Sequence, residues 1–231
     1  MVNVIRFRRP APTGGPITGR HCQARPKNTR ANSPETSQCG RIGTLRRGAL
    51  PLRRIRCRPV PTCLLAFEPP DGGVAEHVLQ LGLGLSAHGW EPRVAGPPQS
   101  SIDEALDEAG IPRVRLPLER GYGRPWRDAG ALRGLLGLLR GGDVDLLHAH
   151  SAKAGALGRI AATATSTPSV YTPHAFAFLR PQPVTRVVAA TLERALGAAT
   201  GAIVCVAEQE RRLALERRIA RPDHLRVVRK G

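Results

Sequence analysis

The chain has 231 residues and a formal net charge of +17, but this charge is distributed very unevenly. Residues 1–60 contain 14 Lys and Arg and one acidic residue, a net charge of +13, whereas residues 61–231 contain 21 basic and 17 acidic residues, a net charge of +4. The composition therefore excludes a generally basic nucleic-acid-binding fold for the larger part, and no run approaches the roughly 20 apolar residues of a membrane span.

Residues 1–60 are rich in Pro and Gly and show no sustained apolar period. Such a segment buries too little apolar surface to offset the entropy of ordering it, so we predict a disordered basic tail. Arg outnumbers Lys 32 to 3, which is typical of a GC-rich genome and leaves open that the tail is a mis-assigned start. The five cysteines form no CxxC pair, so their spacing gives no support to zinc binding by Cys22, Cys39 and Cys57 with His21, and a reduced, cytoplasmic chain is expected.

From residue 61 onward, short apolar runs alternate with segments of helical period. The predicted strands cover 62–67, 91–95, 111–118, 143–149, 168–172, 201–206 and 225–228. The predicted helices cover 74–88, 101–109, 129–140, 152–164, 185–199 and 208–219, the second with a capping box of Ser101 and Glu104. This alternation predicts one Rossmann-like three-layer α/β domain over residues 61–231, with a mostly parallel sheet of about seven strands and right-handed crossovers.

Residues 82–87 match the pattern G-x-G-x-x-A of dinucleotide-binding turns. That motif must lie between a strand and a helix, whereas Gly82 and Gly84 lie inside the first predicted helix. We therefore expect these glycines to allow close packing of the helix on the sheet.

Three loops follow predicted strands, at residues 68–73, 148–155 and 171–176. Loops at the carboxyl ends of parallel strands converge on one crevice, where ligands bind. These loops bring glycines, imidazoles and an ammonium group to one rim. We therefore predict a site for a polar, phosphorylated ligand.

Gly72 and Gly73 let the backbone approach a ligand, and the next helix offers unpaired N–H groups; a plain turn is the alternative. Lys153 opposes the helix dipole at the start of its helix, so it either faces an anion or is a solvated surface residue. Glu208 follows the sixth strand and is either a site residue or part of a solvated helix face.

His148 and His150 lie two apart on a strand and so share a face. His-x-His can bind zinc, but no third ligand is nearby in sequence, and no metal is predicted. A structural histidine and a ligand contact both remain open, and the contact is favoured for His150, which is nearer the loop. His174 follows Pro173, which restricts the loop, and it has the same two interpretations.

Four segments together resemble the N-terminal domain of family 4 glycosyltransferases, which are retaining enzymes of the GT-B fold. They are residues 68–78, 145–155, 170–176 and 204–208. The resemblance implies a site between two Rossmann-like domains, of which the N-terminal one holds the acceptor and the C-terminal one binds most of the nucleotide-sugar. It covers residues 61–231 and does not extend into the tail.

From the resemblance and the loops together, we expect His150 and His174 to be the catalytic residues. Gly72, Gly73, Lys153 and Glu208 are expected to bind substrate. The expected partners are a nucleotide-sugar and a sugar or lipid-linked acceptor, with no cofactor beyond the donor. Peripheral contact with the inner face of the membrane is left open.

Two departures from the family pattern bear on activity. Ala207 stands where the family usually has Ser, and the sequence ends at Gly231 before a second domain. We therefore expect a truncated or split enzyme with little transferase activity by itself, completed by a separate donor-domain chain. The alternatives are a non-catalytic α/β binding module, or a protein that binds anionic polymers or membranes through its tail.

Overall fold

The computed structural model describes residues 60–119, 121, 124–179 and 183–229. Residues 58–231 form a compact unit of their own, to which the following description applies. The predictions for the basic tail, including its cysteines, lie outside the described residues.

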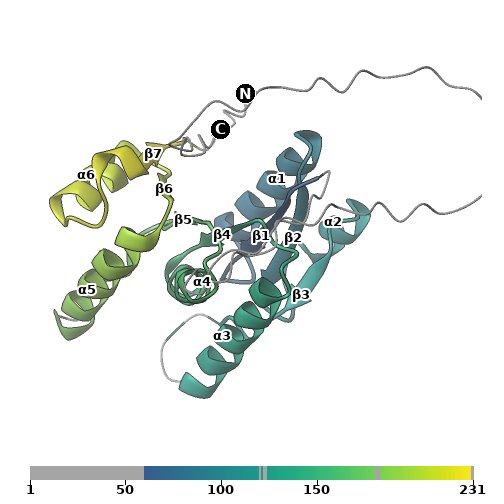
Figure 1. Cartoon of the computed structure of the whole chain (residues 1–231), viewed down its shortest axis with the longest axis horizontal. Coiled ribbons are helices and arrows are strands. Elements are labelled where there is room, and N and C mark those ends of the chain that lie inside the picture. The colour runs from purple at the N-terminus through teal and green to yellow at the C-terminus, as the bar shows by residue number, and fades with distance from the viewer. Residues whose placement is uncertain (1–59, 120, 122–123, 180–182, 230–231) are drawn as a thin grey trace, which may run out of the picture. The chain divides into compact units, whose positions relative to one another are not determined.

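Seven parallel strands form a single sheet in the order β3-β2-β1-β4-β5-β6-β7 (Figure 1). The strands are β1 (Thr62–Ala66), β2 (Glu91–Gly96), β3 (Arg113–Arg115), β4 (Leu146–His150), β5 (Ser169–Thr172), β6 (Ala202–Cys205) and β7 (Leu225–Val227). The chain adds strands on one side of β1 and then returns to add β4 to β7 on the other. The carboxyl ends of β1 and β4 therefore form the topological switch point of the sheet, where α/β domains bind ligands.

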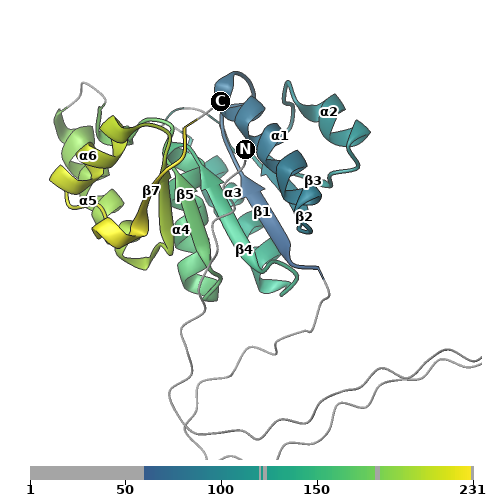
Figure 2. The ribbon, with the colours of Figure 1, turned by 90° about the horizontal axis from the view of Figure 1, so that it is seen from above.

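Helices cover both faces of the sheet, as the two views of Figures 1 and 2 show. They are α1 (Gly73–Ala87), α2 (Asp103–Glu108), α3 (Pro125–Arg140), α4 (Ala152–Thr165), α5 (Pro183–Ala199) and α6 (Glu208–Glu216), with short 3₁₀ helices at Ala177–Leu179 and Pro222–His224. The prediction of one α/β domain with a seven-stranded parallel sheet is confirmed. Within the described ranges, no helix has both the length and the apolar composition needed to cross a bilayer.

Alternate residues of the strands point to opposite faces and build separate parts of the core. On one face, Leu65 and Phe67 of the β1 region pack with Val78 of α1. On the other face, Leu64 and Leu147 pack with side chains of α3 and α4. At the β5 to β7 end, Tyr171, Ile203 and Cys205 pack with residues of α5 and α6, and this cluster includes Phe176 and Phe178. The two phenylalanines are therefore packing residues.

Some glycines inside α1 and α4 lie where a side chain would contact neighbouring residues. A Cβ on Gly82 would lie 3.2 Å from Ile111 Cδ1 and 3.7 Å from Leu65 Cδ1, whereas one on Gly84 would meet nothing within 4 Å. Close packing on the sheet is thus confirmed for Gly82 and is wrong for Gly84. In α4, a Cβ on Gly155 would collide with the ring of Tyr171.

Two helix starts differ from the sequence prediction. The capping box of Ser101 and Glu104 is wrong: α2 begins at Asp103, and in the described residues no side chain caps it. Ser101 instead turns back to the loop after β1, where its backbone N–H donates to the Pro70 carbonyl at 3.0 Å. Helix α3 begins at Pro125, four residues before the predicted start, because proline is well suited to the first helical position.

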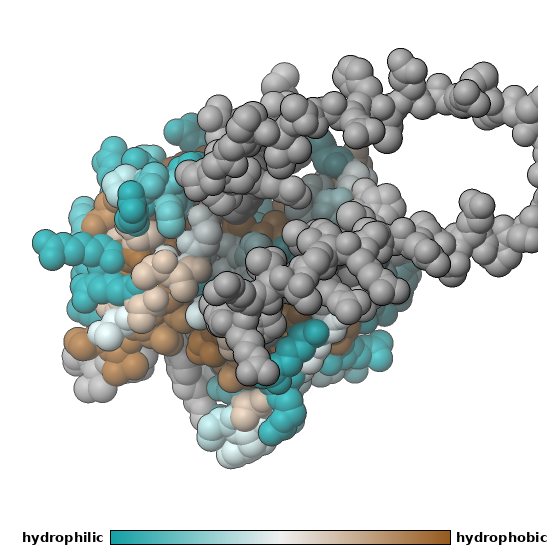
Figure 3. Space-filling model, viewed as in Figure 1, coloured by the Kyte–Doolittle hydropathy of each residue, from teal (hydrophilic) through white to brown (hydrophobic). Residues whose placement is uncertain are grey.

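The surface of α5 is unusually apolar. Val187 and Val188 are 66% and 61% exposed, and Leu192 is 40% exposed. In the view of Figure 3, brown apolar atoms lie at the lower left, over α5. The helix thus presents valines to solvent while Glu193 and Leu196 on its other side are buried.

Candidate functional site

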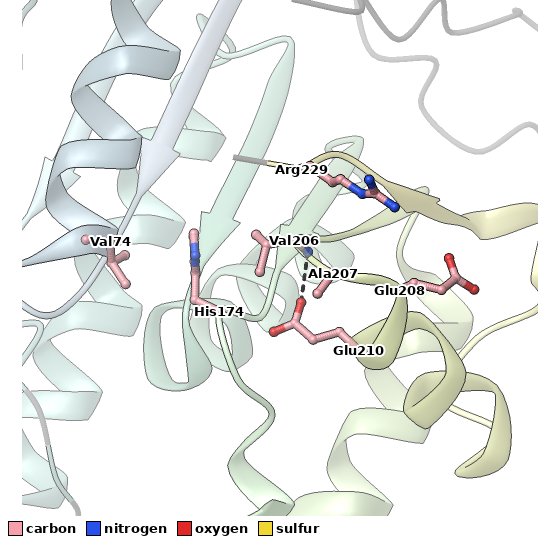
Figure 4. A pocket seen from close by; sticks show the side chains of 8 residues that line it. Val74, His174, Val206, Ala207, Glu208, Glu210 and Arg229 are labelled. Atoms are coloured by element: carbon pink, nitrogen blue, oxygen red, sulfur yellow. Dashed lines mark hydrogen bonds between the residues drawn. The ribbon is translucent and has the colours of Figure 1, made fainter. Parts of the chain in front are cut away.

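A pocket of about 680 Å³ lies where the carboxyl ends of the strands meet the N-termini of α1 and α6. Residues from four separate segments line it: Gly73, Val74, His174, Val206, Ala207, Glu208, Glu210 and Arg229. Figure 4 shows His174 and Val74 on one side of the pocket and Glu208 on the other, with Val206 between them. The structure thus brings together three predicted site residues, Gly73, His174 and Glu208.

The turn before α1 depends on the conformation of Gly72. Its φ is +74° and it occupies the N-cap position of the helix. A Cβ there would meet nothing within 4 Å, so glycine is required by backbone conformation and not by space. Gly73 is exposed, begins the helix and lines the pocket, so the N-terminus of α1 borders it.

Four of the seven histidines gather beside this pocket. His150 is fully buried at the end of β4, and its Nδ1 lies 3.2 Å from Nε2 of His174 in the loop after β5. His77 of α1 contacts both, with ring centroids 5.5 Å from His150 and 5.0 Å from His174. His150 and His174, each predicted as a catalytic residue from a separate strand end, are therefore in direct contact.

His148 lies behind this group and stacks on His150, with ring centroids 4.2 Å apart. Its Nε2 is 2.8 Å from Oγ1 of Thr172 on the adjacent strand. Burial, and then the nearby His77 and His174, lower the pKa of His148 to about 3, so the ring stays neutral at physiological pH. We interpret His148 as a residue that supports the His150 ring.

The backbone at these strand ends adopts conformations that are uncommon for residues with side chains. His174 and Ala175 have φ values of 51° and 114°, and Ser151 has a φ of 64°. Such values cost free energy and are concentrated at functional sites. They fall in the loops that carry the two predicted catalytic histidines.

Lys153, in the first turn of α4, lies against α3 and not at the pocket. Its Nζ is 2.8 Å from Oδ1 of Asp128 on α3, and its side chain is only 9% exposed. Lys153 does not line the pocket. Of the two interpretations from sequence, the solvated surface lysine is wrong, and a role in substrate binding stays a prediction.

At the other side of the pocket, the turn from β6 to α6 is fixed by Glu210, whose Oε2 accepts the backbone N–H of Val206 at 2.9 Å (Figure 4). Glu208 pairs with Arg211 at 2.8 Å, one turn along the helix. Ala207 is exposed at the N-cap position of α6, where in the described residues no side chain caps the helix. The hydroxyl expected from the family pattern would stand here.

Sequence reasoning missed three residues of this region, His77, Glu210 and Arg229. His77 lies one helical turn after Gly73, so its distance from the glycine turn was the available signal. Arg229 follows β7, and it lines the pocket because β7 pairs with β6, an order of strands that the sequence does not show.

The two cysteines of the described domain, Cys63 and Cys205, are buried. Burial raises the pKa of both thiols to about 12, which excludes them as nucleophiles at neutral pH.

A doubly wound parallel sheet, with a glycine turn and imidazoles around a pocket at its strand ends, defines a Rossmann-like ligand-binding domain. The sequence matches the glycosyl transferase 4-like domain family over residues 72–231, and the chain belongs to this family. The prediction of the N-terminal domain of a family 4 enzyme with the GT-B fold is confirmed. No curated protein matches the sequence.

Solved glycosyltransferases share the fold. HepE of Anabaena, solved with UDP and glucose, is 17% identical, with a TM-score of 0.57 over 74% of this chain and 44% of its own. A glycosyltransferase of Rickettsia africae is 16% identical, with a TM-score of 0.57 over 75% and 44%. Sucrose-phosphate synthase of Thermosynechococcus elongatus is 16% identical, with a TM-score of 0.59 over 74% and 48%. The chain spans less than half the length of each of these proteins.

Proposed function

We propose that this domain forms the acceptor-side wall of a retaining glycosyltransferase that uses a nucleotide-sugar donor. The observation that carries the proposal is the pocket in which Gly73, His174 and Glu208 meet at the strand ends. Family membership supports sugar transfer, and the position of the pocket is the one at which α/β domains bind ligands.

The donor diphosphate would approach the glycine turn before α1. The helix dipole favours an anion at this end of the helix. Arg229 adds a cation to the same pocket. A nucleotide-sugar is a suitable ligand because its diphosphate is anionic, and HepE, which has the same fold, was solved with UDP-glucose.

The acceptor and the transferring sugar would contact the imidazoles. His174 lines the pocket directly and would donate or accept a hydrogen bond at a sugar hydroxyl. His150 is buried against it and would hold the ring in place through the 3.2 Å contact between their nitrogens. In this proposal Glu208 is an acceptor for hydroxyl groups, while Lys153, which pairs with Asp128, acts through the position of α4.

The proposal is tested by a transfer assay with radiolabelled UDP-sugars. An extract of the cells that naturally produce this protein supplies the acceptor. We expect little transfer by residues 1–231 alone, because the resemblance places donor binding on a second domain. The assay is therefore repeated with any polypeptide that the DNA encodes directly after codon 231, added in trans or fused. His174→Ala should then lower the rate at least about 10-fold, which corresponds to the loss of about 1.4 kcal/mol of transition-state stabilisation. His88→Ala, at the exposed C-terminal end of α1, should leave the rate unchanged.

Failure of transfer from every nucleotide-sugar, with a donor-binding domain supplied, would overturn the proposal. Binding of UDP-sugars without transfer, measured by ligand-observed NMR, would favour the non-catalytic binding module instead. Full activity of the His174→Ala variant would remove this residue from the site while leaving the enzyme class standing.

A further inference from the structure

We propose that His77, His150 and His174 form a binding site for one divalent transition-metal ion, with Zn²⁺ the best match. The metal site shares His150 and His174 with the proposed sugar-transfer site, and its test measures metal binding and not transfer. Each histidine offers one ring nitrogen, and these three nitrogens lie within 4.8 Å of one another. Of the His-x-His pair only His150 is a ligand; His174 comes from the loop after β5 and His77 from α1, both distant in sequence.

The spacing of the nitrogens suits a shared ion. Two imidazole nitrogens bound to a tetrahedral Zn²⁺ at about 2.0–2.1 Å are separated by roughly 3.3 Å. Nδ1 of His150 and Nε2 of His174 are 3.2 Å apart. The ring of His77 stands at 64° to that of His150 and at 75° to that of His174, so its plane differs from those of the other two rings.

The ligands are carried by elements that restrict their movement. His150 ends the central strand β4 and is 0% exposed, and His77 lies in the second turn of α1. His148 stacks on His150 with ring centroids 4.2 Å apart, and Thr172 holds the His148 ring by a hydrogen bond. This stacking restricts the orientation of the His150 ring. Neighbouring groups orient the imidazoles of metal sites, commonly by hydrogen bonds; here the neighbour of His150 is a stacked ring.

The chemistry of the donors indicates the class of ion and of its ligand. Imidazole suits Zn²⁺, Cu²⁺, Ni²⁺ and Fe²⁺, whereas Mg²⁺ and Ca²⁺ prefer oxygen donors. Three histidines leave a fourth position open, as in catalytic zinc sites. Because His174 also lines the pocket, that position borders the pocket. The fourth ligand would be water or an oxygen atom of a pocket ligand, such as a phosphate or a sugar hydroxyl.

The test is a titration of the full chain, prepared without a histidine tag and treated with chelator, using Zn²⁺ in calorimetry and Co²⁺ in visible spectroscopy. Because His21 and three cysteines precede the domain, the titration is repeated with His21→Gln, Cys22→Ser, Cys39→Ser and Cys57→Ser combined. We expect one ion per chain in both proteins, and a Co²⁺ spectrum without thiolate charge-transfer bands.

In the same background, His77→Ala and His174→Ala should each weaken binding about 100-fold or more, since even changes behind the ligands cost about 10–100-fold. His88→Ala and His224→Ala, outside the cluster, are the matched controls and should bind as before. Thermal unfolding in EDTA shows that each variant is folded. The proposal is overturned by absence of binding, by loss of binding in the tail variant, or by undiminished binding in His77→Ala and His174→Ala.

Discussion

Glu68, in the loop after β1, accepts the backbone N–H of Lys153, at the start of α4, through its Oε1 at 2.9 Å. The hydroxyl of Ser151 adds a second link, since it donates to the Glu68 carbonyl at 2.6 Å. Glu68 is only 6% exposed. A buried carboxylate from one strand end thus caps the helix that follows the neighbouring strand, and it holds together the two loops at the switch point of the sheet.

Replacement of Glu68 should test this link. We expect Glu68→Ala to lower the free energy of unfolding by about 1–2 kcal/mol, the scale of a lost helix cap, while Glu68→Gln keeps an acceptor oxygen and loses less. Urea unfolding followed by circular dichroism measures both. The control is Glu104→Ala, an exposed acid of α2, which should change stability by less than about 0.5 kcal/mol. No loss in Glu68→Ala would show that the cap is unimportant.

The fold could be predicted from sequence because each strand and helix shows its own period in neighbouring residues. The same local signals located the rim that holds Gly73 and His174. Local signals could not identify contacts between residues that are distant in sequence. Lys153 is paired with an aspartate on a different helix, and Ser101, which has the local pattern of a cap, binds the carbonyl of Pro70 instead. His77 lies one turn after the glycine turn, which places it near the rim, but the sequence does not show that it faces His150 and His174.

The buried ion pair of Arg159 and Glu193 links α4 to α5. The guanidinium and carboxylate are 2.9 Å apart and 1% and 5% exposed. The Tyr171 hydroxyl donates to the same carboxylate at 3.2 Å, and the guanidinium lies over the Tyr171 ring. Removing either partner leaves a buried charge, so we expect Arg159→Ala and Glu193→Ala each to cost about 3–5 kcal/mol of unfolding free energy.

The double variant Arg159→Met/Glu193→Leu separates the cost of an isolated charge from the value of the pair. Because it buries apolar groups and no charge, it should be more stable than either single alanine variant. Equilibrium urea unfolding of all four proteins gives the comparison. A double variant less stable than both single variants would show that the pair itself stabilises the domain.

Two helical glycines should respond in opposite ways to the same substitution. A Cβ on Gly197 of α5 would collide with the backbone carbonyl of Ile219, whereas one on Gly84 of α1 would meet nothing within 4 Å. We expect Gly197→Ala to destabilise by about 1–3 kcal/mol or more through overpacking, and Gly84→Ala to stabilise by about 0.5–1 kcal/mol through helix propensity. Thermal unfolding of the pair checks this, and destabilisation by Gly84→Ala would contradict it.

Ala207 lies at the N-cap position of α6 with extended backbone angles, φ −145° and ψ 154°, which suit a capping side chain. A serine there would place its oxygen near the free N–H groups of the first turn, and we expect Ala207→Ser to raise stability by about 1 kcal/mol. For a domain of this size the melting temperature should rise by about 2–4 °C. Ala129→Ser, on the exposed face of α3, has no cap to make and should lower the melting temperature slightly.

Because Ala207 also lines the pocket, the same variant restores the hydroxyl that the family pattern carries beside His174. If the transfer assay shows a faster rate with Ala207→Ser, that hydroxyl contacts substrate; if only the melting temperature rises, its contribution is to the helix alone.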